Sequence, residues 1–186
     1  LTTLRFSTVF GSGSGIPDLS PTAFLVNECN NIYMSGWGGG SLNARVNGFI
    51  TSTSGLRVSE DAIQKSTSGH DFYFIVLTDN AGEFLYGTFL GGSQSLTHVD
   101  GGTSRFDKHG IVYHAVCSGC NTDRLGAKSD FPTTANAWSK TNNSPNCNNA
   151  AFKFDLSSLK AGIQTNSEEL NSPGLSIICM PDKIVF

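Results

Sequence analysis

The chain has 186 residues and a net charge of −3 at neutral pH, and only 15% of its residues are charged, against about 25% in an ordinary soluble domain. The sequence has no cluster of Lys or Arg, so it lacks the electrostatic attraction that drives binding to nucleic acids and to anionic membranes. Its longest apolar run, residues 72–77, is too short to cross a bilayer as a helix.

The first half of the chain carries four strand-like segments. Residues 6–10 precede a glycine, residues 22–27 and 31–36 flank a short polar turn, and residues 71–78 are mostly apolar. Aromatic and β-branched residues favour strands, and Asn and Gly tolerate the positive φ angles of tight turns. The sequence therefore predicts a four-stranded unit, with the Gly- and Ser-rich residues 37–57 as an insertion before the last strand.

The second half repeats this pattern about 80 residues later. Tyr113 follows Tyr33 by 80 residues, and the opening strand of each unit ends in glycine, at Gly11 and Gly91. Four-stranded units in series are typical of propeller blades. We therefore expect an all-β, propeller-like fold with two long four-stranded blades, and the alternative is a β-sandwich. The predicted strands of the second unit are residues 84–90, 103–107, 111–116 and 150–156.

Three parts follow from this pattern. Residues 1–83 are expected to form the first propeller-like repeat, residues 84–156 the second, and residues 157–186 a connector with the first strand of a following domain. Because the sequence begins at Leu1 and its last residues read as a strand, we expect it to be part of a longer chain.

The five cysteines allow several kinds of site, and their odd number leaves at least one without a partner in this segment. His114, Cys117, Cys120 and Cys147 could together hold zinc, and Cys117 and Cys120 also have redox-motif spacing. A disulfide from Cys147 to Cys117 or Cys120 is favoured, because a third strand ends where the fourth begins. The roles of Cys29 and Cys179 stay open.

No pattern in the sequence predicts a catalytic centre. His98 and Asp100 lack a third partner at a recognisable spacing, and a role for Asp100 in capping the following turn is favoured. We therefore expect no catalytic residues, no cofactor and no resident metal. Among the aromatic residues, Tyr33 and Tyr113 are expected in the core, and Trp37, beside three glycines, is the one expected to face a ligand.

Several motifs resemble one known family. The glycine-ended opening strand, the hairpin pattern and the sequence Ser-Asp-Phe-Pro-Thr-Thr at 129–134 look like the seven-bladed propeller repeat of bacterial surface proteins. Residues 35–39 and 98–107 resemble gliding-motility-associated surface proteins, in which such a region precedes PKD domains. The first unit departs from the motif at residues 57–61. The resemblance implies export by type IX secretion and repeats without known chemistry.

The expected function is a non-catalytic structural or adhesive module of a large secreted or cell-surface bacterial protein. The alternative is a carbohydrate-binding module, and a secreted hydrolase is the third candidate. Expected partners are other domains of the same longer chain, neighbouring surface-protein subunits and glycans, with neither nucleic acid nor a membrane span. The few charges, many glycines and several cysteines favour an extracellular or outer-surface location.

Overall fold

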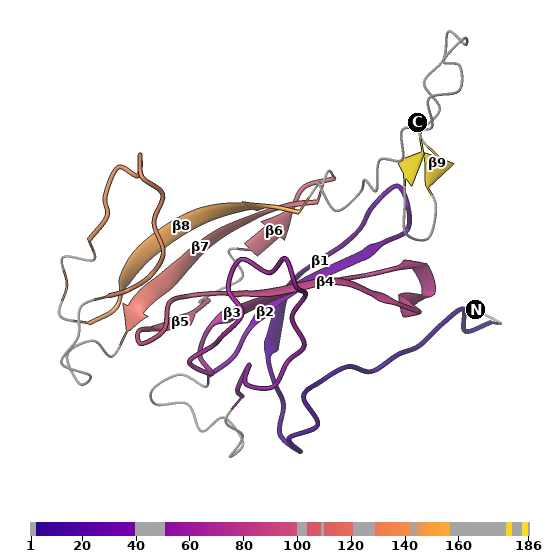
Figure 1. Cartoon of the computed structure of the whole chain (residues 1–186), viewed down its shortest axis with the longest axis horizontal. Coiled ribbons are helices and arrows are strands. Elements are labelled where there is room, and N and C mark those ends of the chain that lie inside the picture. Colours follow the sequence, from indigo (N-terminus) through magenta and orange to yellow (C-terminus); the bar gives the residue numbers. More distant parts are fainter. Residues whose placement is uncertain are drawn as a thin grey trace, which may run out of the picture.

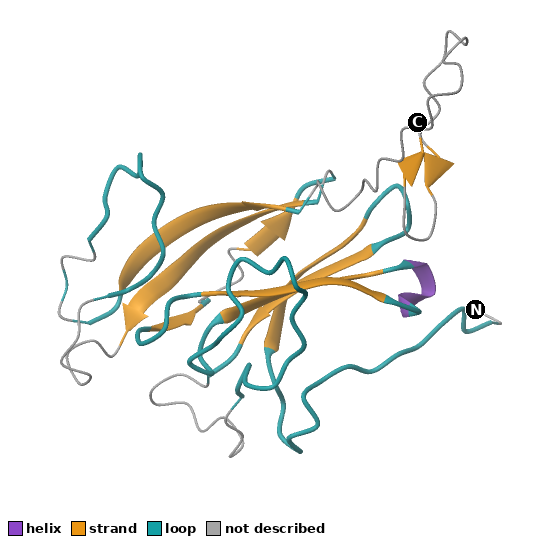
Figure 2. Cartoon of the chain, viewed as in Figure 1, coloured by secondary structure: helices purple, strands orange, loops and turns teal. Residues whose placement is uncertain are grey.

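The computed structural model describes residues 3–39, 51–99, 104–108, 110–120, 129–141, 144 and 146–156, and the backbone of two short strands near the C-terminus. These residues form an all-β fold with two four-stranded antiparallel sheets (Figure 2). The described part of the chain contains no helix with the length and hydrophobicity that crossing a bilayer requires. Its one helical element is the single 3-10 turn η1 (Asp79–Ala81).

The first sheet is a meander in which each strand pairs with the next one along the chain. Its central strand β3 is buried on both faces, which explains the continuous apolar run. Short turns join β1 to β2 and β3 to β4, and short turns favour antiparallel neighbours. The strands are β1 (Ser20–Val26), β2 (Ile32–Trp37), β3 (Phe72–Leu77) and β4 (Phe84–Leu90).

The second sheet is built around its longest strand, β7. The strands are β5 (Leu96–His98), β6 (Ser104–Phe106), β7 (Ile111–Cys120) and β8 (Asn148–Asp155). Strand β8 pairs with β7 over residues 111–118, so β5 and β6 share the opposite edge of β7 as two pieces of a broken strand. A separate short pair joins β9 (Ile178–Cys179) to β10 (Ile184–Val185).

The predicted repeat is present in the hairpins. In the first sheet Val26 pairs with Ile32, and in the second sheet Phe106 pairs with Val112; each residue lies 80 positions after its counterpart. The two hairpins therefore have the same register, and the predictions of hairpins at 27–31 and 107–110 are confirmed, although His109 lies outside the described residues.

The turns of the two hairpins are also equivalent. The side-chain oxygens of Asn27 and Asp107 accept hydrogen bonds from the backbone N–H groups of Asn31 (2.9 Å) and Ile111 (3.1 Å). Such Asx side chains replace a backbone acceptor within a turn. Turn chemistry thus fixes the register of both hairpins locally.

The sheets stack face to face, and equivalent strands lie against each other (Figure 1). Strand β1 contacts β6, and Phe74 of β3 stacks on Phe154 of β8 with ring centroids 4.9 Å apart. The buried residues between the sheets are Tyr33, Phe72, Phe74, Val76, Tyr86, Leu90, Val99, Val112, Val116, Phe154 and Leu156.

The stacking is head to tail. Tyr33 is fully buried and faces the second sheet, whereas its counterpart Tyr113 points away from the first sheet and is 44% exposed. The expectation of a core position was therefore right for Tyr33 and wrong for Tyr113. Equivalent faces of the two sheets point in the same direction, so one sheet is related to the other by displacement along the stack.

Three predictions about the strands are wrong. Residues 6–10 form no strand (Figure 1). Residues 84–90, expected to open the second unit, close the first sheet as β4, because the short turn after β3 returns the chain to that strand's free edge. Phe74 and Phe152, matched at a spacing of 78, are out of register by one, since Leu77 and Phe154 are the equivalent pair.

Candidate functional site

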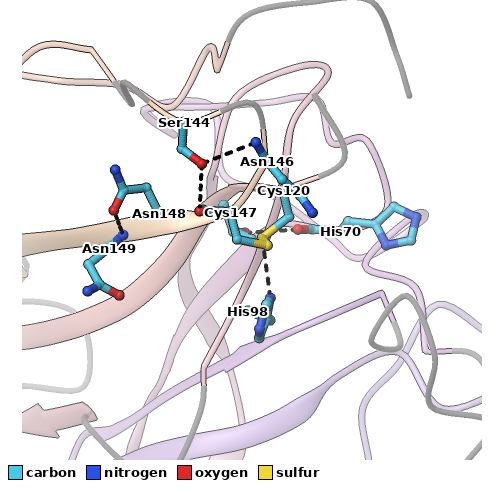
Figure 3. Close-up of a disulfide and its surroundings, with 9 residues drawn as sticks. His70, His98, Cys120, Ser144, Asn146, Cys147, Asn148 and Asn149 are labelled. Atoms are coloured by element: carbon cyan, nitrogen blue, oxygen red, sulfur yellow. Dashed lines mark hydrogen bonds between the residues drawn. A yellow bond between two sulfur atoms is a disulfide. The ribbon is translucent and has the colours of Figure 1, made fainter. Parts of the chain in front are cut away.

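A disulfide closes the long insertion between β7 and β8. Cys120, the last residue of β7, is bonded to Cys147, just before β8, across a sequence separation of 27. This is one of the two pairings that the sequence left open. His98 lies beside the bridge, with its Nδ1 atom 3.7 Å from the sulfur of Cys120 (Figure 3). Cys29 is also disulfide-bonded; the side chain of Cys179 lies outside the part of the chain that the structure describes.

His114 serves the packing between the sheets. Its Nε2 lies 3.3 Å from the hydroxyl of Ser35 and its Nδ1 lies 2.8 Å from the hydroxyl of Ser104. The ring of Phe152 stacks on the imidazole with centroids 4.8 Å apart. Burial of this ring lowers the pKa of His114 to about 4, because the apolar interface disfavours the charged form.

The four candidate zinc ligands do not come together. His114 points toward the first sheet, with Ser35 and Ser104 on its nitrogens, while Cys120 is bonded to Cys147. Among the described residues no three His, Cys, Asp or Glu side chains are grouped so that they could hold a metal ion. Residue Asp100 lies outside the described residues.

Asp130 fastens a loop between the sheets. Its carboxylate accepts hydrogen bonds from the backbone N–H groups of Ser93, Gln94 and Ser95, at 2.6, 2.9 and 3.0 Å, and from two serine hydroxyls of the same loop. Partial burial alone would raise the pKa of Asp130, but the bonds from Ser95 and Ser93 outweigh it and lower the pKa to about 2.

This role explains the 129–134 motif, to which sequence analysis assigned no structural role. Its Asp130 binds the loop after β4, and its Phe131 packs on Phe152, with ring centroids 6.1 Å apart. The signal available in the sequence is an Asp next to Phe-Pro together with a distant Gly-Gly-Ser-Gln-Ser loop, whose amides have no strand partner. The motif thus couples the insertion to the sheet interface.

A second carboxylate, Asp71, is fully buried where β3 begins. It accepts hydrogen bonds from the Thr67 hydroxyl (2.7 Å) and the Ser68 N–H (2.9 Å), while burial raises the pKa of Asp71 despite these bonds. Gln64 reaches the same place, and its side-chain oxygen accepts a hydrogen bond from the Gly91 N–H (3.1 Å). Asp71 and Gln64 thus hold the ends of β3 and β4 together.

The two tryptophans differ from the expectation. Trp37 is partly buried, packs against the core between the sheets and lies with its ring centroid 5.8 Å from that of His98. It is therefore not the exposed aromatic residue that the neighbouring glycines suggested. Trp138 is the fully exposed tryptophan, and sequence analysis gave it no role.

A groove of about 580 Å³ runs along the outer edge of β8. One wall is β8 itself, over residues 149–153, and the other wall is the insertion segment 131–141. The lining is mostly small and apolar or hydroxyl-bearing, with Trp138 and Lys140 at the insertion side. Such an edge presents a row of backbone groups that another strand can pair with.

Comparison with protein-family models, with curated protein sequences and with solved structures gave no match.

Proposed function

We propose that this chain is a non-catalytic structural and adhesive module of a large secreted or cell-surface bacterial protein. In this proposal its sheets are blades of a propeller-like stack, and further domains of the same longer chain or neighbouring subunits continue it. The observation that carries the proposal is the head-to-tail stacking of two equivalent sheets, in which Tyr33 and Tyr113 point the same way.

Stacking of this kind suits a scaffold. When a unit offers the same pair of faces as its neighbour, another unit can add at the end without a new kind of interface. A closed two-sheet sandwich would instead bury the equivalent faces against each other. The relation between Tyr33 and Tyr113 therefore favours a repeating array over the β-sandwich alternative.

The groups with chemical potential have structural partners, which also supports the proposal. His114 lies between two serine hydroxyls, Asp130 binds a loop, and Cys120 and Cys147 close an insertion. A disulfide is most stable in an oxidising compartment, which agrees with a surface or extracellular location.

The experiment uses the producing bacterium. Antibodies raised against the folded chain should label intact cells or their medium, and non-reducing peptide mapping of that material should find Cys120 bonded to Cys147. Protein found only inside the cell, with both cysteines reduced, would overturn the proposal.

The glycan-binding alternative has one observation in its favour, the fully exposed ring of Trp138. Aromatic faces of this kind stack on sugar rings. Saturable binding to a glycan array that is lost in Trp138→Ala and kept in Trp37→Phe would select this alternative.

A further inference from the structure

The groove beside β8 occupies the place of a missing fourth strand. In the second sheet the Ala137 N–H donates to the Thr134 carbonyl (3.1 Å), and in the first sheet the Ala62 N–H donates to the Ser59 carbonyl (3.2 Å). The two turns are 75 residues apart, and Trp138 and Ile63, which follow them, are both exposed apolar residues. Segments 59–64 and 134–139 are therefore equivalent.

In the first sheet, β4 lies between β3 and segment 59–64. The Ser59 N–H donates to the Gly87 carbonyl (3.0 Å), and the Phe89 N–H donates to the Gln64 carbonyl (3.1 Å). The opposite edge of β4 pairs with β3. In the second sheet the corresponding elements, 134–139 and β8, border the open groove. The groove therefore has the surroundings of an antiparallel strand.

One described segment has the sequence of that strand. Residues 6–11, Phe-Ser-Thr-Val-Phe-Gly, align at a spacing of 80 with residues 86–91, Tyr-Gly-Thr-Phe-Leu-Gly, most of β4 and the glycine after it. The segment forms no strand, and its apolar side chains are exposed, Val9 at 95% and Phe10 at 43%. It has the composition of a buried strand without the burial.

The loop that follows this segment is seated in the equivalent way. Asp130 lies against Gly92 in the loop after β4. Seventy-five residues before Asp130, Gly55 lies against Ser12, the counterpart of Gly92. Because Gly55 has no carboxylate, Asp18 binds the Ser12 N–H instead (2.9 Å). Loop 11–15 therefore meets the first sheet as loop 91–95 meets the second.

This seating fixes where residues 6–11 belong. Strand β4 precedes the second sheet in the chain but lies in the sheet stacked before it. By the same relation, residues 6–11 belong to a sheet stacked on the outer face of the first sheet, and residues 8–11 do border a hollow at that face, near Tyr73 and Ile75. The first sheet thus separates them from the groove of their own chain.

We propose that residues 6–11 of one copy fill the groove beside β8 of a second copy, so that copies add head to tail by strand donation. Transfer of the β3–β4 register, in which Phe74 pairs with Thr88, places Thr8 opposite Ala151 of the other copy. The new strand completes the second sheet with the backbone hydrogen bonds that β4 makes in the first.

The outer faces of the sheets match the same arrangement. Inside one chain Phe106 packs against Tyr33, with ring centroids 6.0 Å apart. Their counterparts 80 residues earlier and later are Val26 and Tyr113, and these are 46% and 44% exposed. The junction between copies brings this exposed pair together as the internal junction brings together Phe106 and Tyr33. The proposal rests on the repeat and not on the adhesive role, so its failure leaves the proposed function standing.

The test is a cross-link between two single variants of the full chain. Residues directly opposite in neighbouring antiparallel strands have Cβ atoms close enough to be joined. Thr8→Cys protein mixed with Ala151→Cys protein should therefore yield, under mild oxidation, a mixed dimer whose peptide map joins residues 8 and 151. Ser14→Cys, which lies outside the strand, is the matched control and should give no such product.

Sedimentation of the otherwise unaltered chain gives the second readout. Proline at position 8 removes a backbone donor from the donated strand, so Thr8→Pro should weaken association about tenfold or more, whereas Ser14→Pro should leave it unchanged. Equal cross-linking from Ser14→Cys, association unaffected by Thr8→Pro, or a link formed within single molecules of the double variant at high dilution would each overturn the proposal.

Discussion

His114 and Asp130 illustrate how this protein uses its few titratable side chains. His114 is 3% exposed and has a serine hydroxyl at each ring nitrogen. Asp130 accepts hydrogen bonds from three consecutive backbone N–H groups. A buried polar group costs stability unless its hydrogen bonds are made. Both side chains therefore tie neighbouring segments together, and both do so in one protonation state.

Replacement of Asp130 by asparagine should destabilise the fold by about 1–3 kcal/mol, because loop amides lose a charged acceptor. The pKa of Asp130 is about 2 in the folded state and near 4 in an unfolded chain. A lowered carboxylate pKa stabilises the fold above the unfolded value, and that contribution disappears as the pH falls from about 4 toward 2.

Urea unfolding of Asp130→Asn at pH 6 and at low pH checks this prediction. The difference from the unaltered protein should shrink at low pH. Asp61→Asn, at an exposed position, is the matched control and should have little effect. An Asp130→Asn variant as stable as the unaltered protein at pH 6 would contradict the assigned role.

His114 should give the opposite kind of evidence, a loss of stability in mild acid. Its pKa is about 4 when folded and about 6.5 when unfolded, so the unfolded chain binds the proton first as the pH falls between these values. At about 1.4 kcal/mol per pKa unit, the loss approaches about 3 kcal/mol by pH 4. Unfolding free energies of His114→Gln, measured from pH 7 to 4, should lack this part of the slope.

At the scale of elements, the end of β7 and the start of β8 depend on the Cys120–Cys147 bridge. The bridge joins two strands that are already paired over residues 111–118. It therefore limits the freedom of the insertion in the unfolded chain more than it positions the strands. Gly119, with a φ of 65°, gives β7 a local irregularity between Cys117 and Cys120.

Cys147→Ser should lower the free energy of unfolding by about 3–4 kcal/mol, the value expected for a loop of this length. Guanidinium titration under non-reducing conditions measures the change. Cys117→Ser leaves the bridge in place and should cost much less. If reducing agent destabilised the unaltered protein no more than the Cys147→Ser variant, the bridge would have no role in stability.

The hairpins could be predicted from the sequence because their turns are encoded locally by Asn27 and Asp107. The membership of β4 could not, since a spacing of 80 shows that two segments are equivalent but not which sheet holds them. The partner of Cys147 depended on how β7 ends, and the exposure of Tyr113 on which face of its sheet is covered. Periodicity cannot supply either fact, because both are decided by tertiary contacts.

At the scale of the whole molecule, the two sheets form one stack joined by aromatic side chains. Phe74 is fully buried and stacks on Phe154, and it also meets His114 edge to face with ring centroids 5.8 Å apart. Contacts of this kind make the sheets unfold together, since neither retains a covered face alone.

Phe74→Ala should therefore destabilise the whole molecule by about 3–5 kcal/mol, the usual cost of removing a buried phenylalanine ring. Circular dichroism and tryptophan fluorescence should still report one coincident transition. Phe24→Ala, at a position that is 64% exposed, is the control and should change stability little. Separate transitions in the unaltered protein would show that the sheets are independent.

The Cys120–Cys147 bridge also has a mechanical consequence. A chain that is pulled from its ends transmits force through the bridge and bypasses the residues between, a separation of 27 positions. At about 3.3–3.6 Å per extended residue, roughly 90 Å of contour length stays out of reach. A single-molecule extension trace should lengthen by that amount once the bridge is reduced. If the protein bears load at a cell surface, its maximum reach would then depend on the redox state of its surroundings.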